Sequence, residues 1–267
     1  MSPARRRALV ALGAALVLVV GVVVGAGLRA RESTSDAVSQ SRPGAVLLVP
    51  GYGGSTSSLQ TLADALTASG RRTVVVQLPG DGTGDLRAQA AAVKAAADGA
   101  IVAGAPSVDV VGYSAGGVVA RIWAADLGGA AQARRIVTLG SPHHGTELAG
   151  LGSALAPGAC PLACRQLVPG SDVLTGLPET PSGPVWTSLW TTQDQTVVPP
   201  DSARLEGALD IEVQSICPDA SVQHGQLPRD PLVIGLVEQA LDVAPMTQAP
   251  APSRCAALRA RGGAGST

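Results

Sequence analysis

Hydrophobic and polar positions follow two alternating periods along the chain from residue 44 onward. Short aliphatic runs typical of buried parallel strands are followed by segments whose apolar residues recur at helical spacing. The expected elements are strand 45–49, helix 57–69, strand 73–78, helix 85–103, strand 107–111, helix 115–127, strand 135–139, strand 185–191, strand 209–216 and helix 229–242. This alternation predicts an α/β fold, with a mostly parallel central sheet of about six strands and helices on both faces.

The beginning of the chain follows a different pattern. Three arginines at 5–7 precede an uncharged, largely apolar stretch at 8–28, which is long enough to cross the ~30 Å hydrocarbon core of a bilayer. The arginines favour a cytoplasmic N-terminus and export of the remaining chain. Residues 1–30 are therefore a signal peptide, with small residues at 24–26 for cleavage, or a membrane anchor. We favour the anchor, because the apolar run is long for a signal peptide.

The remaining sequence divides into a polar linker at 31–43, one domain at 44–245 and a Pro/Ala/Gly-rich tail at 246–267. About 200 residues are enough for a single domain with a full core. Within it, residues 143–184 form an irregular stretch between two strands, and such long insertions are usually functional. We expect a lid or a substrate cleft there, with a passive surface insertion as the alternative.

One short motif suggests nucleophilic chemistry. The stretch from Gly112 to Gly116 places Ser114 between a β-branched strand and a helix, where the chain must turn sharply. Glycines on either side make room for the turn, and the start of the helix offers free N–H groups and a positive dipole to an oxyanion. The alternative is an ordinary Gly/Ser turn.

A nucleophilic serine needs a base, and the chain has three histidines. His224 lies in a turn-rich loop between the last expected strand and the last helix, where a base at the carboxyl edge of a parallel sheet belongs. Asp194, three residues after strand 185–191, is the expected orienting carboxylate, and Asp201 is the second candidate. His143 and His144 open the insertion, and we expect them to shape the substrate cleft.

Two backbone N–H groups are candidates for an oxyanion hole. One is that of Ala115, directly after the serine, and the other is that of Tyr52, in the Gly-rich loop after the first strand. A Gly-rich loop can also hold phosphate, but this one has no Gly-Lys-Ser/Thr ending.

The motifs VPGYGGS, GYSAGG, TLGSPHHGT and DQTVVPP, together with the His224 loop, resemble those of bacterial lipases and esterases of the α/β-hydrolase superfamily. They look most similar to the small secreted lipases of actinobacteria and bacilli. The resemblance spans residues 44 to about 245 and implies an α/β-hydrolase fold that cleaves carboxylic esters through Ser114, His224 and Asp194, with an acyl-enzyme intermediate and no cofactor. One departure is the absence of Phe, so the acyl pocket would be aliphatic.

Cysteines and charge refine this picture. Four cysteines in an exported chain suggest two disulfides, and of the three pairings we favour Cys160 with Cys164 and Cys217 with Cys255. A zinc site built from the cysteines, His143 and His144 is a weaker alternative, because oxidation outside the cell competes with it. A net charge of −1 gives no support to nucleic-acid binding.

The leading functional hypothesis is an exported ester hydrolase, acting as a monomer on lipids or other apolar esters. It would be extracellular or held on the outer face of the cell membrane through its N-terminal segment. An acyltransferase with the same three residues and a catalytically silent binding protein on a hydrolase scaffold are the alternatives.

Overall fold

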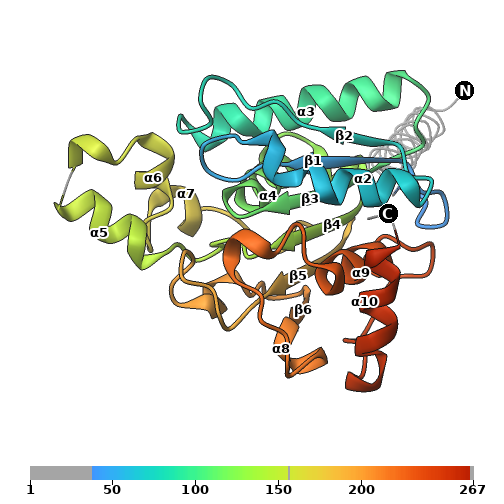
Figure 1. The fold of residues 1–267 in the computed structure, drawn as a ribbon. Coiled ribbons are helices and arrows are strands. Elements are labelled where there is room, and N and C mark those ends of the chain that lie inside the picture. Colours follow the sequence, from blue (N-terminus) through green and yellow to red (C-terminus); the bar gives the residue numbers. More distant parts are fainter. Residues whose placement is uncertain (1–37, 156, 265–267) are drawn as a thin grey trace, which may run out of the picture. The chain divides into compact units, whose positions relative to one another are not determined.

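The computed structural model describes residues 38–155 and 157–264 of the 267-residue chain. A six-stranded sheet in the order β2-β1-β3-β4-β5-β6 lies at its centre, and every neighbouring pair is parallel (Figure 1). The strands are β1 (Ala45–Val49), β2 (Thr73–Val75), β3 (Val108–Tyr113), β4 (Ala133–Leu139), β5 (Val185–Trp190) and β6 (Leu209–Glu212). The predicted α/β architecture is confirmed.

Helices cover both faces of this sheet. On one face α3 (Leu86–Val102) and α4 (Ala115–Asp126) pack against alternate strand residues such as Leu47 and Val110. On the other face α2 (Gln60–Ala68) and α9 (Pro231–Ala240) pack against the intervening residues, such as Leu48. The near-continuous aliphatic strands of the sequence are thus buried on both sides, as parallel strands require.

The remaining helical segments connect these layers. They are the short turns η1 (Thr56–Leu59), η2 (Gly129–Ala131), η3 (Pro157–Ala159), η4 (Pro200–Ala203), η5 (His224–Gln226) and η6 (Pro252–Arg254), and the helices α5 (Glu147–Leu155), α6 (Leu162–Gln166), α7 (Asp172–Thr175), α8 (Val213–Ile216) and α10 (Cys255–Gly263). Figure 1 shows α5, α6 and α7 together at one end of the sheet. The insertion at 143–184 therefore contains three helices, whereas the sequence suggested an irregular stretch.

Two other expectations need correction. The strand expected at 209–216 ends at Glu212 and continues as α8, in which Val213 and Ile216 lie one helical turn apart and are both buried. A short apolar run fits both the two-residue period of a strand and the 3.6-residue period of a helix, so tertiary packing decides which of the two forms. The strand expected at 73–78 is likewise shorter and ends at Val75.

The tail also departs from the sequence analysis, because it contains α10, which packs closely on α9 (Figure 1). Glycines permit this approach: a Cβ at Gly262 would lie 2.0 Å from the carbonyl oxygen of Pro231, and one at Gly235 would lie 2.1 Å from that of Leu258. The domain therefore extends beyond the boundary expected at 245.

The N-terminal segment at 1–30, expected to be a signal peptide or an anchor, lies outside the described residues, as does most of the linker. Within the part that is described, no helix is both long enough and apolar enough to cross a membrane.

A buried charge cluster fixes α9 to the amino end of the sheet. Asp109 on β3 accepts hydrogen bonds from Arg134 at 3.0 and 2.6 Å, and both side chains are fully buried. Arg134 also donates to the carbonyl oxygens of Leu241 and Asp242, at 2.6 and 2.9 Å. These carbonyls end α9, so the arginine both neutralises Asp109 and caps the helix.

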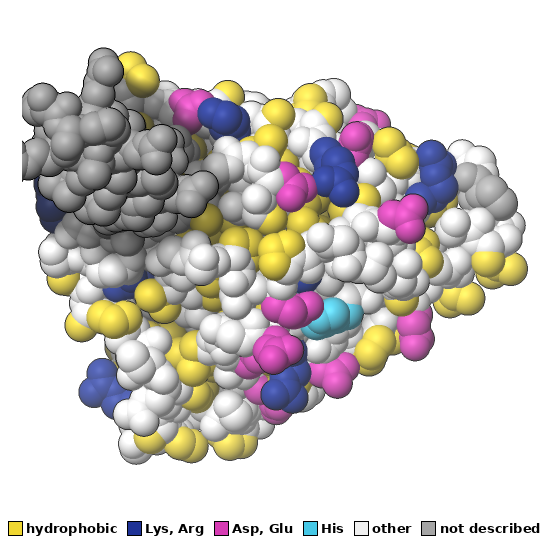
Figure 2. Space-filling view, turned by 180° about the vertical axis from the view of Figure 1, so that it is seen from behind, with side chains coloured by type: hydrophobic (Ala, Val, Ile, Leu, Met, Phe, Trp, Pro, Cys, Tyr) yellow, Lys and Arg dark blue, Asp and Glu magenta, His cyan; other side chains and the backbone are white. Residues whose placement is uncertain are grey.

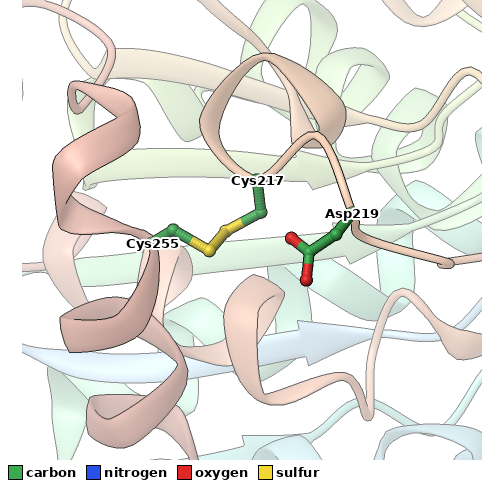
Figure 3. A group of neighbouring side chains, drawn as sticks. All are labelled: Cys217, Asp219 and Cys255. Atoms are coloured by element: carbon green, nitrogen blue, oxygen red, sulfur yellow. A yellow bond between two sulfur atoms is a disulfide. The ribbon is translucent and has the colours of Figure 1, made fainter.

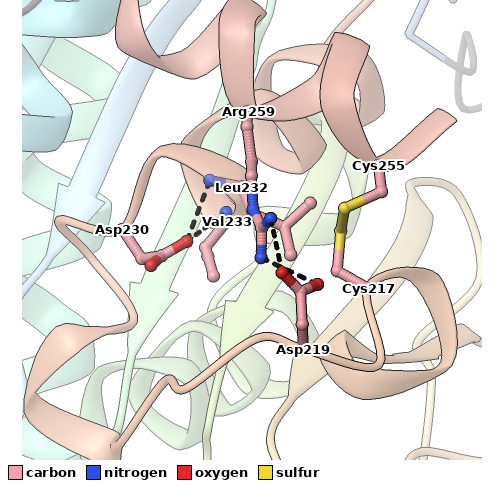
Figure 4. The surroundings of a disulfide bond; sticks show 7 residues. All are labelled: Cys217, Asp219, Asp230, Leu232, Val233, Cys255 and Arg259. Carbon is pink, nitrogen blue, oxygen red and sulfur yellow. Dashed lines mark hydrogen bonds and ion pairs between the residues drawn. A yellow bond between two sulfur atoms is a disulfide. The ribbon is translucent and has the colours of Figure 1, made fainter.

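The four cysteines form two disulfides, Cys160–Cys164 and Cys217–Cys255, which are the pairs favoured from the sequence. The second joins the segment after α8 to the start of α10 (Figure 4). Asp219 lies beside this disulfide (Figure 3) and pairs with Arg259 of α10 at 3.0 and 3.2 Å. Because the two sulfur atoms are bonded to each other, this group offers no thiolate ligand to a metal ion.

The two disulfides should differ in their contribution to stability. Cys217 and Cys255 are 38 residues apart and Cys160 and Cys164 only four. In the chain-entropy model the long loop contributes about 4 kcal/mol to the free energy of unfolding and the short loop about 2 kcal/mol. We expect Cys217→Ser with Cys255→Ser to lower the free energy of unfolding in urea by about twice as much as Cys160→Ser with Cys164→Ser. Equal losses of unfolding free energy in the two double variants would contradict this ranking of the disulfides.

Candidate active site

The turn between β3 and α4 holds Ser114 in an unusual backbone conformation. Its φ of 54° and ψ of −129° make it the only non-glycine residue with a positive φ in the described part of the chain. Such strain persists only where the surroundings impose it. A Cβ at Gly112 would lie 2.5 Å from Gly117 Cα, and one at Gly116 would lie 2.3 Å from the carbonyl oxygen of Val49. Close backbone packing therefore forces the serine out above the carboxyl edge of the sheet, as the sequence predicts.

Ser114 is also the N-cap residue of α4, but its side chain does not cap the helix. Its Oγ instead lies 3.0 Å from Nε2 of His224. The hydroxyl thus faces a histidine while the free N–H groups of the first helical turn lie beside it.

His224 begins η5, in the loop between α8 and α9. Its Nδ1 lies 2.7 Å from Oδ2 of Asp194, and its side chain is only 10% exposed. Two hydrogen bonds thus connect the carboxylate to the imidazole and the imidazole to the hydroxyl. The structure therefore brings together the three side chains that the sequence analysis selected.

Asp194 is held rigidly just after β5. Its other oxygen, Oδ1, accepts the N–H groups of Thr196 and Val197, both at 2.8 Å, so Oδ2 is directed at the imidazole. Asp201, the second candidate, lies exposed on η4 and is not a partner of His224.

A glycine that the sequence analysis did not select makes this pair possible. Gly140 follows β4 with a φ of 53°, and a Cβ there would lie 3.1 Å from Asp194 Oδ2 and 3.2 Å from His224 Nδ1. It would also lie 2.5 Å from a Leu227 methyl group. The sequence does contain a signal for this residue, since Gly140 directly follows an apolar strand.

The two backbone groups expected to form an oxyanion hole belong to segments that adjoin Ser114. Ala115 is the first residue of α4, so its N–H has no acceptor within the helix. The loop carrying Tyr52 passes against the serine, since a Cβ at Gly51 would lie 2.9 Å from Ser114 Cβ. The Tyr52 side chain is 45% exposed.

His143 and His144, which we expected to shape the substrate cleft together, lie in different environments. His143 is fully buried, with Nε2 3.1 Å from Thr138 Oγ1, so it does not line an open cleft. Burial, together with the nearby charge of Arg121, lowers the pKa of His143 and keeps it neutral. His144 is exposed and lies 3.1 Å from Glu179.

Comparison with solved structures places this arrangement in a known fold. The mature form of Bacillus licheniformis lipase BlEst2 matches with a TM-score of 0.61 and 18% identity, covering 74% of this chain and 91% of the lipase. Aspergillus fumigatus lipase B matches with a TM-score of 0.62 and 20% identity over 83% of this chain and 56% of its own length. An α/β hydrolase enzyme, MGS-MChE2, from a sediment metagenome matches with a TM-score of 0.50 and 16% identity over 74% of this chain and 88% of its own.

This chain has the α/β-hydrolase fold. No protein-family model matches the sequence, and a comparison with curated proteins finds no match. At these levels of identity the likeness establishes the fold alone.

Within this α/β-hydrolase fold, a buried arginine attaches the insertion to α4. Arg121 is fully buried and donates to the carbonyl oxygens of His143, Leu177 and Pro178 at 3.0, 2.9 and 2.7 Å. It also donates to Glu179 at 3.1 Å. Both ends of the insertion are thus held by the helix that begins after Ser114. A single arginine on the apolar face of the helix was the signal that the sequence analysis left unused.

The turn at Ser114 should tolerate no side chain at Gly116. We expect Gly116→Ala to prevent folding or to lower the melting temperature severely, because the methyl group would meet backbone oxygens that cannot yield. Gly99→Ala in the last turn of α3 is the matched control, since nothing lies within 4 Å of a Cβ built there. It should leave stability unchanged or raise it by up to about 1 kcal/mol. Thermal unfolding followed by circular dichroism measures both, and similar melting temperatures would contradict the packing described here.

Proposed function

We propose that this chain is a serine ester hydrolase in which Ser114 is the nucleophile, His224 the general base and Asp194 the residue that orients the base. The observation that carries the proposal is the line of two hydrogen bonds, 2.7 Å and 3.0 Å long, that joins the three side chains at a strained turn. A hydroxyl in hydrogen-bond contact with an imidazole, itself oriented by a buried carboxylate, is the arrangement that activates serine.

The reaction follows from these contacts. Nε2 of His224 takes the proton as Ser114 Oγ attacks the ester carbonyl carbon, and the imidazolium returns that proton to the departing alkoxide. Water then attacks the acyl-enzyme, giving its proton to the same nitrogen, and Ser114 leaves with that proton restored. Asp194, hydrogen-bonded to Nδ1 of His224, keeps Nε2 directed at the serine throughout.

The negative charge that develops on the carbonyl oxygen needs fixed donors. The N–H groups of Ala115 and Tyr52 are the proposed donors. The start of α4 at Ala115 and the passage of Gly51 against Ser114 support this assignment. The positive end of the α4 dipole adds to the same stabilisation.

Apolar esters, lipids among them, are the proposed substrates. Residues 148–164 contain no charged side chain, and α5 and α6 expose four leucines: Leu148, Leu151, Leu155 and Leu162. Figure 2 shows hydrophobic side chains exposed at the end of the molecule where these helices lie. Contacts link this segment to the proposed oxyanion loop, since Ala163 donates to Thr83 and Gly53 donates to Gly82 in the neighbouring turn.

The cellular location and finer family type are also proposals. Two disulfides support an exported protein, because such bonds persist in oxidising compartments. The relationship to small secreted actinobacterial lipases, contact with a membrane through the N-terminal segment and a monomeric state rest on the sequence analysis.

Removing the proposed nucleophile or base should abolish turnover without unfolding the protein. We expect Ser114→Ala and His224→Ala each to lower kcat for a nitrophenyl ester by on the order of 10⁴-fold, because the two groups act as one unit. Ser215→Ala, at an exposed serine of α8, is the matched control and should keep full activity. Near-normal turnover by Ser114→Ala would overturn the proposal.

The two candidate carboxylates should be separable by their amides. Asp194→Asn should lower kcat on the order of 10³-fold or more, since an amide neither fixes the imidazole tautomer nor stabilises the imidazolium. Asp201→Asn, exposed on η4, should leave kcat within about twofold of the parent value. Steady-state kinetics on the same ester distinguishes them, and the reverse ranking would make Asp201 the orienting acid.

A further inference from the structure

Tyr113, the last residue of β3, is in contact with His224 in two ways. Its phenol hydroxyl donates a hydrogen bond to the backbone carbonyl oxygen of His224 at 3.3 Å. Its ring lies beside the imidazole, with 5.2 Å between the ring centroids and 34° between the planes. The residue that precedes the proposed nucleophile thus also contacts the proposed base.

The His224 loop depends on contacts of this kind because it is not part of the sheet. Upstream, Thr191 donates to the carbonyl oxygen of Val222 at 2.6 Å. Downstream, the N–H of Leu227 donates to the carbonyl oxygen of His224 at 3.2 Å. Tyr113 holds the histidine itself, from the end of the strand that leads directly to Ser114. The positions of base and nucleophile are therefore coupled through one side chain.

The chemistry of the phenol fits the role of a hydrogen-bond donor that holds the His224 backbone. Burial, followed by the negative charge of Asp194, raises the pKa of Tyr113 to about 12, while Arg229 acts in the opposite direction. The hydroxyl therefore remains protonated at neutral pH and can donate to the carbonyl oxygen without competing as a base.

The ring adds an electrostatic contribution. When His224 takes the proton from serine it becomes a cation within 6 Å of an aromatic centroid, a separation at which the π-electrons of the ring attract positive charge. The attraction exists only once the imidazole is protonated, so it favours the transition state over the resting state.

We propose that Tyr113 is a positioning residue for the base: its hydroxyl fixes the backbone at His224 and its ring supports the imidazolium. This inference rests on the proposed function of the same site. It assigns to the variable position of the Gly-x-Ser-x-Gly motif a role beyond that of a turn residue.

The test compares Tyr113→Leu with Tyr113→Phe on a short nitrophenyl ester. The leucine variant loses both contacts and should lower kcat about 10- to 100-fold with KM changed less than twofold, because base geometry is altered and ester binding is not. The phenylalanine variant keeps the ring and should recover most of the loss, remaining about two- to tenfold below the parent. Tyr113→Met takes the place of the leucine variant if the latter melts below the assay temperature.

A control separates positioning from packing. Val75→Ala removes methyl groups from a half-buried residue of the same core cluster and should lower the melting temperature while leaving kcat unchanged. If Tyr113→Leu behaves in the same way, with parental kcat and only a lower melting temperature, the positioning role is wrong. If the parent itself does not hydrolyse esters, the proposed function fails first, and that result is distinguishable because no variant is needed to obtain it.

Discussion

The backbone conformation of Ser114 is the constraint on which the site depends. A non-glycine residue with positive φ is held there because β1, β3 and α4 approach so closely that only glycine fits at positions 112 and 116. The strain is offset by the packing of the surrounding core, where the aliphatic residues of β1 and β3 are fully buried. The free energy gained by burying these strands therefore stabilises the strained backbone that places the Ser114 hydroxyl at the start of α4.

The two side chains that act with that hydroxyl, Asp194 and His224, come from distant parts of the chain, and local hydrogen bonds hold each of them in place. Asp194 is oriented by two backbone N–H groups, and Gly140 leaves space for its contact with His224. The histidine loop is held by contacts to β3 and to the segment after β5. Parallel strands bring these segments to one edge, because all carboxyl ends lie there. The His224 loop lies outside the sheet, and specific hydrogen bonds hold it in place.

The sequence predicts those parts of the molecule in which local pattern and tertiary packing agree. The aliphatic run of β1 between Gly44 and Pro50 has the bounds expected of it, and the residues 114, 194 and 224 meet as expected. Elements decided by packing alone were not predictable. The segment at α8 fits two periods, and α10 is stabilised by glycine contacts with α9 and by a disulfide rather than by a strong apolar stripe. The burial of His143 depends on the path of the insertion, which no local pattern reveals, whereas that of Arg121 is indicated only by its place on the apolar face of α4.

The central claim is that His224 activates Ser114, and covalent labelling tests it most directly. A fluorophosphonate reacts with an activated serine, and mass spectrometry of the digested protein identifies the modified residue. We expect a single phosphonylated residue, Ser114, with labelling at least about 10²-fold slower in His224→Ala than in the parent protein. Modification of another serine, or labelling of Ser114 at the same rate in both proteins, would contradict it.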